Sequence, residues 1–337
     1  MNTVTARACP NIALIKYWGN RNDELRLPAA DSLSLTLDHP SVEIAIDHQK
    51  ELRIQSFESD GKERILTEKQ IARFRVHLAL TKTYLETIGH GNAIPNSISM
   101  TIRSGIPPGI GLASSAAVFG CLAKAYAGLI ADKVKLTLQQ QSVIGRLGSG
   151  SAARSLYGGF AALWAGEGDD IGSAVAREIA PETHWPLHDF VIIPDHGEKK
   201  VGSTEGHALA GTSPLFAQRL DAIRTRRQQE CVDAILKKDF EKLRAVTEED
   251  ALDMHRVMET SVPPIKYLSS ETYRILREIE ELRTQKHLPV LYTMDAGPTV
   301  HLLCEPDAES AIAAFASTQK NCTVFHAKAG PGACFVQ

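Results

Sequence analysis

Residues 106–130, IPPGIGLASSAAVFGCLAKAYAGLI, begin with prolines and glycines and continue as a long run of small and apolar residues. The run keeps helical spacing for about four turns, which predicts a buried helix entered directly from a glycine-rich loop. Such a loop brings the backbone close to a ligand, and the following helix presents unpaired N–H groups and its positive dipole end. Phosphate binding is one interpretation of the segment, and a tight connection without a ligand is the other.

This loop departs from the common nucleotide-binding motifs. It contains neither GxxxxGK[ST] nor GxGxxG, which excludes a P-loop and a dinucleotide-binding fingerprint. Ser114 and Ser115 supply hydroxyl donors at the start of the predicted helix. The segment 107–117 therefore has the parts of a phosphate cradle without matching either motif.

The residues on either side of this segment show both strand-like and helical patterns. Upstream, strand-like runs flank one long helical pattern at 68–88, which predicts a sheet with a helix laid across it; the runs are 41–46, 51–57 and 97–104. Downstream, a helical pattern at 136–148 leads into RLGSGSAARSLYGG at 146–159. Glycine and serine dominate that stretch, so its composition indicates either a flexible turn or a loop that closes around an anion.

The second half of the chain predicts an α+β sandwich. The pattern loosens at 166–188 into polar, proline-containing runs, and we expect the boundary there, with domains at 1–183 and 184–337. Beyond it, strand and helix patterns follow in the order strand, helices, strand, strand, helix, strand. The strands are expected at 190–195, 289–295, 299–305 and 321–327, and the main helices at 213–256 and 269–285.

Bulk composition narrows the classes of partner and compartment. The 337 residues include 37 basic and 40 acidic side chains. The resulting net charge of −3 argues against nucleic acid or an anionic membrane as partner. The six cysteines show no CxxC pair and no zinc spacing, so neither disulfides nor a metal site is indicated and a cytoplasmic setting is expected. No segment approaches the roughly 20 apolar residues that span a bilayer.

Three charged residues stand out by their setting. Lys16 lies between the apolar run IALI and an aromatic pair, so its ammonium either meets a partner inside the protein or extends past the rings to solvent. Asp295 ends a predicted strand before an Ala-Gly-Pro turn, a position that suits a functional site and a simple turn former alike. Arg154 is either a surface charge or a bidentate ligand of a carboxylate or phosphate.

Seven blocks, in order from residue 11 to residue 303, resemble one family. They are NIALIKYWG, LPAADSLSLTL, GLASSAA, GSGSAARSLYGG, STEGHALAGTSP, PPIKYL and DAGPTVHLL. The chain is similar to the mevalonate diphosphate decarboxylase family of the GHMP small-molecule kinase superfamily. The resemblance implies a two-domain α+β fold with an N-terminal mixed sheet, a C-terminal ferredoxin-like sandwich and an active site in the cleft between them. It also implies a homodimer.

The resemblance also implies the chemistry. Members of this family use ATP with Mg²⁺ to phosphorylate the 3-hydroxyl of a mevalonate phosphate, after which phosphate and carbon dioxide leave and an alkene forms. By the same resemblance Asp295 orients or accepts the hydroxyl proton, Lys16 lies beside it, and Ser114 donates to the migrating phosphate. The implied substrate contacts are Tyr17, Asn20, Ser149, Ser151, Arg154, Ser203 and Thr204. The implied ATP-phosphate contacts are Pro108, Gly109, Gly111, Ala113, Ser114 and Ser115, and the ligands of Mg²⁺ stay unknown.

Two positions depart from the family pattern. Asn20 and Thr204 stand where the family carries cations that face the 5-diphosphate of its substrate. One ion pair near 4 Å contributes on the order of 4 kcal/mol before desolvation, so two missing cations favour a less charged substrate. We therefore expect mevalonate 5-phosphate, converted to isopentenyl phosphate, with mevalonate 5-diphosphate as the alternative. Arg21 or the pair Lys199-Lys200 could supply the missing charge.

Two further alternatives have distinct signatures. A kinase that phosphorylates the 3-hydroxyl and stops would release ADP without carbon dioxide. A nucleotide-binding module without chemistry would bind ATP and release no ADP. Lys16, Arg154, Ser114 and Asp295 occur together in this chain, which favours the decarboxylase over both.

Overall fold

The computed structural model describes residues 3–49, 51–106, 114–194 and 202–336. The first sheet has the strand order β15-β1-β6-β8-β7. It is a mixed sheet, because β7 and β8 run parallel while the other neighbours run antiparallel. Its strands are β1 (Val4–Ala8), β6 (Val42–His48), β7 (Arg53–Glu58), β8 (Ile98–Ser104) and β15 (Cys334–Phe335).

The second sheet is antiparallel and has the order β10-β9-β5-β2. Its strands are β2 (Asn11–Ile15), β5 (Ser32–Thr36), β9 (Phe160–Trp164) and β10 (Val175–Ala180), and a small ribbon of β3 (Asn20–Asn22) and β4 (Leu27–Pro28) lies beyond β2 in the chain. Every residue of β2 and β5 is buried, which indicates that both faces of this sheet are covered.

The helices of the first half begin where local signals predict. α1 (Glu68–Thr87) and α3 (Leu138–Gly148) each start at a threonine capping box, formed with Gln70 and Gln140. Both helical patterns read from the sequence are thus confirmed. A buried 3₁₀ helix, Gly150–Leu156, follows α3 directly, so most of the stretch 146–159 is helical and packed.

α2 (Ser114–Leu129) is the buried helix that the segment 106–130 predicts. Most of its residues are buried, and small side chains let it pack closely against α3, the 3₁₀ helix, β1 and β6. The glycine-rich loop before it lies outside the described residues at 107–113.

The second half contains a third sheet, of order β12-β13-β11-β14, with antiparallel neighbours. Its strands are β11 (His188–Pro194), β12 (Val290–Thr293), β13 (Val300–Cys304) and β14 (Cys322–Lys328). The helices are α4 (Ser203–Leu209), α5 (Phe216–Ala222), α6 (Gln228–Lys237), α7 (Phe240–Glu259), α8 (Ser270–Lys286) and α9 (Glu309–Ser317), with a π-helical turn at Ile223–Arg227 and short 3₁₀ turns at Ala210–Thr212 and Pro306–Ala308.

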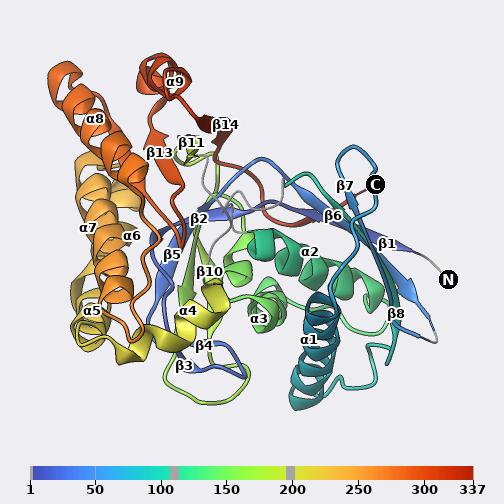
Figure 1. The fold of residues 1–337 in the computed structure, drawn as a ribbon. Helices are drawn as coiled ribbons and strands as arrows, with labels where there is room; N and C mark the ends of the chain where they lie inside the picture. Colours follow the sequence, from blue (N-terminus) through green and yellow to red (C-terminus); the bar gives the residue numbers. More distant parts are fainter. Residues whose placement is uncertain (1–2, 50, 107–113, 195–201, 337) are drawn as a thin grey trace.

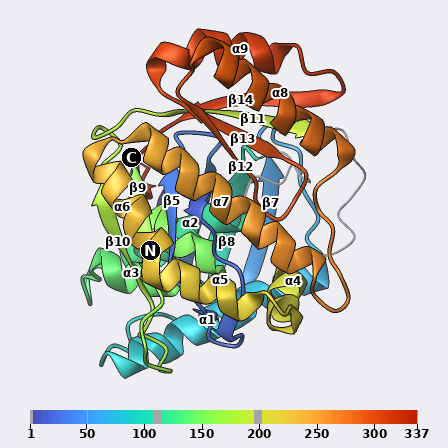
Figure 2. The same ribbon diagram turned by 90° about the vertical axis from the view of Figure 1, so that its left-hand side faces the viewer.

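The helices and sheets form successive layers (Figure 1). Helices α6 and α7 cover one side of the sheet that contains β2 and β5, and α2 and α3 separate that sheet from the one that contains β1 and β6. Figure 2 shows the third sheet with α8 and α9 over it, stacked at one end of these layers. Among the described residues, no helix has the length and apolar character needed to cross a membrane.

The two halves share core and strands. One hydrophobic cluster joins apolar residues of β2 and β5 to residues of α6, α7, β12 and β13. β15, at the end of the chain, pairs with β1, so the last residues return to the first half. The expected boundary at 183/184 stays a prediction, but the loosened region before it contains β10, a short strand whose sequence VAREIA has no regular alternation of apolar and polar residues.

Close packing at the end of α3 generates a stability prediction. A Cβ added at Gly148 would lie 2.0 Å from Cδ1 of Phe119. Phe119 is itself confined by the rings of Phe74 and His77. Overpacking of this kind costs about 1–3 kcal/mol, so Gly148→Ala is expected to lower the Tm by several degrees in a thermal-unfolding experiment. Gly211→Ala is the control, because no heavy atom lies within 4 Å of the added Cβ, and equal Tm values would contradict the prediction.

Candidate active site

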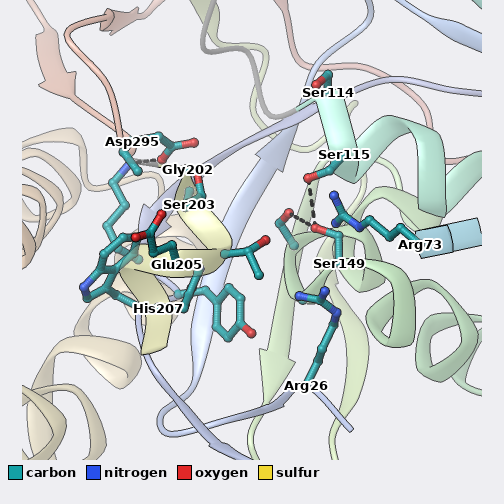
Figure 3. A pocket seen from close by; sticks show the side chains of 18 of the residues that line it. Arg26, Arg73, Ser114, Ser115, Ser149, Gly202, Ser203, Glu205, His207 and Asp295 are labelled. Carbon is teal, nitrogen blue, oxygen red and sulfur yellow. Dashed lines mark hydrogen bonds and ion pairs between the residues drawn. The ribbon is translucent and has the colours of Figure 1, made fainter. Parts of the chain in front are cut away.

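A cavity of about 900 Å³ opens where the two halves meet. Residues from β2, α1, α2, the 3₁₀ helix, α4 and the loop after β12 line it (Figure 3). Its charged lining, among the described residues, consists of five cations and two carboxylates: Lys16, Arg26, Lys69, Arg73 and Arg154, with Glu205 and Asp295. The chain as a whole has a net charge of −3, so the positive charge is concentrated here.

Lys16 and Asp295 form an ion pair at one wall of the cavity. Lys16 follows β2 and its side chain is 1% exposed, while Asp295 follows β12 and keeps 30% exposure toward the cavity. The Lys16 Nζ donates to Asp295 Oδ1 at 2.7 Å. The Lys16 ammonium therefore meets a partner inside the protein and does not extend past the aromatic rings to solvent.

The ion pair shifts the pKa of both partners. Burial lowers the pKa of Lys16 below its ordinary value, and the attraction of Asp295 offsets only part of that effect. Burial alone would raise the pKa of Asp295, but the ammonium of Lys16, helped by His301, outweighs it and leaves that pKa lowered. The carboxylate therefore stays ionised at neutral pH and can accept or orient a proton at the cavity wall.

Arg154 projects from the 3₁₀ helix and is fully buried. Its guanidinium donates to the hydroxyls of Ser34 and Ser32, at 2.8 and 2.5 Å, and to Asn11 Oδ1 at 3.3 Å. Burial lowers its pKa to about 10. No carboxylate of the described residues pairs with it by a salt bridge, so a cation held by neutral acceptors lines the cavity and favours an anion there.

The glycines and serines of the stretch 146–159 build a packed wall. A Cβ at Gly150 would lie 2.3 Å from the ring of Tyr17, so only glycine lets this turn approach the ring so closely. Three hydroxyls line the cavity in a row, with Oγ–Oγ distances of 3.1 Å from Ser115 to Ser149 and 3.2 Å from Ser149 to Ser151. Each can turn a hydrogen toward a ligand, so the row offers neutral donors beside Arg154.

Sequence reasoning missed three cations that line the cavity. Arg26, Lys69 and Arg73 line the cavity, and Figure 3 shows the guanidinium groups of Arg26 and Arg73 close to Ser149. Arg73 donates to the carbonyl of Gly148 at 2.7 Å, and burial lowers its pKa to about 10. A signal did exist, since Lys69 and Arg73 are four residues apart on one face of the predicted helix 68–88.

Of the substrate contacts implied by the family resemblance, some line the cavity and one does not. Tyr17, Ser203 and Thr204 line the cavity. Asn20 is not among the residues that line it, because its side chain accepts from the Tyr17 hydroxyl and donates to Asp23. The structure thus places Asn20 behind the cavity wall.

Of the cations expected to compensate for Asn20 and Thr204, the structure describes only Arg21, and its guanidinium is engaged with other parts of the protein. The Arg21 guanidinium donates to the carbonyls of Pro28, Ala165 and Gly168 and to the Ser173 hydroxyl. Its hydrogen bonds therefore connect parts of the protein to one another. Lys199 and Lys200 lie outside the described residues.

The N-terminus of α2 supplies the described part of the expected phosphate site. Ser114 and Ser115 both line the cavity there. Pro108, Gly109, Gly111 and Ala113 lie outside the described residues, so their contacts stay predictions. For Mg²⁺, the described cavity offers the carboxylates of Glu205 and Asp295 and the serine hydroxyls, which are the hard oxygen donors this ion prefers.

α4 forms a further wall with a neutral histidine. The His207 ring contacts the rings of Tyr17 and Trp18, with centroids 4.4 and 4.6 Å apart. Its Nδ1 accepts from the Gly19 N–H at 3.0 Å. Burial lowers the pKa of His207 to about 3, so this residue adds no charge to the cavity at neutral pH.

A buried ion pair holds the backbone of Lys16. Asp250 of α7 accepts from the Lys16 N–H at 2.7 Å, and Arg219 of α5 donates to the Lys16 carbonyl at 3.3 Å. Arg219 and Asp250 pair with each other at 2.9 Å with both side chains fully buried, and Arg227 adds a second guanidinium. These residues position Lys16, and no motif in the sequence pointed to them.

Comparison with known proteins gives the class and then the family. Solved structures with the same overall fold include mevalonate diphosphate decarboxylases from Staphylococcus aureus (29% identity, TM-score 0.86, 99% of this chain and 98% of that one) and Enterococcus faecalis (30%, 0.84, 99% of each). A structure described as MDDEF in complex with MVAPP, AMPPCP and magnesium aligns at 31% identity, covers 99% of each chain and has a TM-score of 0.85. The fold and its cationic cavity define a protein of the GHMP small-molecule kinase class, as predicted.

Sequence matches identify the family. The description "Diphosphomevalonate decarboxylase-like N-terminal domain" matches residues 8–174, and "Mevalonate 5-diphosphate decarboxylase C-terminal domain" matches residues 190–329. Human diphosphomevalonate decarboxylase is 34% identical over 304 residues, which are 88% of this chain and 75% of the relative. The Candida albicans protein is 34% identical over 309 residues, 88% and 83% of the two chains. The chain belongs to the diphosphomevalonate decarboxylase family.

The ion pair beneath Lys16 generates a second prediction. Asp250→Asn keeps the shape of the side chain but removes one of the two carboxylates that the buried Arg219 and Arg227 share, the other being Asp253, and breaking a buried pair costs up to about 3–5 kcal/mol. We expect a clear fall in Tm on thermal unfolding. Asp221→Asn, which removes an exposed pair with Arg224, is the matched control and should change the Tm little. A Tm for Asp250→Asn equal to that of the control would show that the buried pair does not stabilise the fold.

Proposed function

We propose that the chain converts mevalonate 5-diphosphate, with ATP, into isopentenyl diphosphate, ADP, phosphate and carbon dioxide. The observation that carries the proposal is the Lys16–Asp295 pair, which faces a cavity whose other charged residues among those described are four cations and one carboxylate, Glu205. A carboxylate that stays ionised beside a fixed ammonium can take the proton that a hydroxyl loses as its oxygen attacks a phosphoryl group. Family membership supports the same reaction, since the relatives are named diphosphomevalonate decarboxylase.

In this mechanism Asp295 accepts or orients the proton of the 3-hydroxyl. The hydroxyl oxygen then forms a bond to the terminal phosphorus of ATP, and the bond from that phosphorus to ADP breaks. Lys16 stabilises negative charge on the transferred phosphoryl group, because its ammonium is fixed by burial and already paired. Ser114 donates to the same group from the start of α2.

The second step breaks two bonds and forms one double bond. The bond between the carboxylate carbon and C2 of the substrate breaks, and its electron pair forms the C2–C3 double bond. The bond from C3 to the new phosphate breaks at the same time, so carbon dioxide and phosphate leave. Arg154, with Ser149 and Ser151, binds the anionic groups of the substrate and holds them for this step.

Mg²⁺, when bound, neutralises charge on the nucleotide phosphates. Glu205 and the hydroxyls of Ser114 and Ser115 are oxygen donors of the described cavity that suit this ion, together with phosphate oxygens and water. The homodimer and the cytoplasmic location stay predictions.

Three cations that line the cavity offset the two that are missing at Asn20 and Thr204, and so remove much of the reason to prefer mevalonate 5-phosphate. They are Arg26, Lys69 and Arg73. Figure 3 shows Arg26 and Arg73 close to Ser149, where their positive charge suits a second phosphate. Mevalonate 5-phosphate stays the second candidate, because Thr204 lines the cavity without a charge.

Product and rate measurements test the function. We expect one carbon dioxide released for each ADP and a higher kcat/KM with mevalonate 5-diphosphate than with the monophosphate. ADP without carbon dioxide would indicate a kinase, ATP binding without ADP a binding module, and a preference for the monophosphate would support the second candidate. Asp295→Asn should abolish turnover and leave ATP binding nearly intact, and an active Asp295→Asn enzyme would remove the aspartate from the mechanism.

Arg73 gives a test of substrate recognition. Charge-assisted hydrogen bonds contribute about 1.5–3 kcal/mol, so Arg73→Gln should lower kcat/KM for the diphosphate by roughly ten- to hundredfold, with a smaller loss for the monophosphate. Arg75→Gln, at an exposed position on the same helix, is the control and should leave the kinetics unchanged. Equal losses for both substrates would assign Arg73 to a contact other than the second phosphate.

A further inference from the structure

Three metal-ligating side chains converge far from the cavity, on the sheet of the second half. His188 begins β11, His326 lies on the neighbouring strand β14, and Glu309 is the first residue of α9. Figures 1 and 2 show α9 beside these two strands, at the end of the molecule away from α1. None of the three residues lines the catalytic cavity. The proposed function assigns them no role.

Strand register brings the two histidines together. His188 pairs with Lys328, and Phe190 pairs with His326, so the histidines are diagonal neighbours on adjacent antiparallel strands. Residues two apart on a strand share a face, which places both rings on the same side of the sheet. The Phe190 ring stacks on the His326 ring at 4.3 Å with an interplanar angle of 5°, and this contact fixes the orientation of the imidazole.

The three ligand atoms form a compact triangle. His188 Nδ1 and His326 Nε2 are 2.9 Å apart, and Glu309 Oε1 lies 3.6 Å from the first and 3.9 Å from the second. A point in the plane of these atoms lies about 2.0 Å from each of them, by the geometry of that triangle. Zinc binds histidine nitrogen at about 2.0–2.1 Å and carboxylate oxygen at about 2.0–2.2 Å.

Hydrogen bonding within the cluster does not explain the position of the carboxylate. Both distances from Glu309 Oε1 to the imidazole nitrogens exceed the length of an N–H···O hydrogen bond. Across 2.9 Å one ring nitrogen can donate a proton to the other, so at least one of the facing nitrogens is unprotonated, and its lone pair can bind a metal ion in place of that proton. The oxygen is thus too far away to accept from either ring, and close enough to share a cation with both.

We propose that His188, Glu309 and His326 bind one divalent transition-metal ion, for which zinc has the fitting ligand set and distances. The His188 side chain is 15% exposed and the other two are 42% and 41% exposed, so the ion has access from solvent and water can complete its coordination. The ion joins α9 to β11 and β14 and so stabilises the second half of the fold. The ligands are far apart in sequence, which explains why motif spacing did not reveal the site.

Zinc titration of the purified full-length chain tests the site. Isothermal titration calorimetry with Zn²⁺ should show one more bound ion in the wild type than in Glu309→Gln or His326→Ala. Saturating Zn²⁺ should raise the wild-type Tm by at least roughly 2 °C and leave the Tm of both variants unchanged. His90→Ala, which removes an exposed histidine elsewhere, is the control and should behave as the wild type.

Cobalt gives an independent readout of the ligands. Co²⁺ bound to the wild type should show the visible absorption of a nitrogen- and oxygen-ligated site, and the two variants should lose it. The conservative Glu309→Gln decides the question if His326→Ala fails to fold. Zinc binding that is absent from the wild type, or equal in wild type and Glu309→Gln, would overturn the proposal.

Discussion

The buried ammonium of Lys16 is the constraint on which the site depends. A lysine charge in a packed interior is costly unless another charge and hydrogen bonds stabilise it. The partner, Asp295, comes from the other half of the chain, so the ion pair forms only when β2 and β12 are both in place. Asp250 and Arg219 hold the backbone of the same lysine, which extends the constraint from the active site into the helical layer.

This arrangement concentrates positive charge in one cavity of a chain with negative net charge. Two of the three arginines that line the described cavity are held by neutral groups: Arg154 by hydroxyls and an amide oxygen, and Arg73 by a carbonyl and the ring of Phe119, 4.7 Å away. Neutral acceptors satisfy N–H groups without cancelling charge, so the electrostatic field remains available to a ligand. A site for two polyanions needs this property, because carboxylate partners would compete with the substrate.

Local signals predicted more of the fold than of the site. The capping boxes at Thr67 and Thr137 and the apolar run of α2 were readable, because helix starts and buried helices depend on neighbouring residues. β10 was not found, since its support comes from its pairing with β9, distant in sequence. Their local setting singled out Lys16 and Asp295, and the family resemblance supplied their roles. Arg219 and Asp250 became visible only with the packing of α5 and α7.

The stretch 146–159 shows why composition can mislead about mobility. Glycine and serine are typical of flexible linkers, yet here Gly148 and Gly150 are the residues that let helices pack against Phe119 and Tyr17. The same close approach brings the Ser149 hydroxyl within hydrogen-bond distance of the Ser115 hydroxyl and lets the carbonyl of Gly148 accept from Arg73. Donors fixed in this way need little reorganisation when an anion arrives, so rigidity at these glycines contributes to recognition as well as to stability.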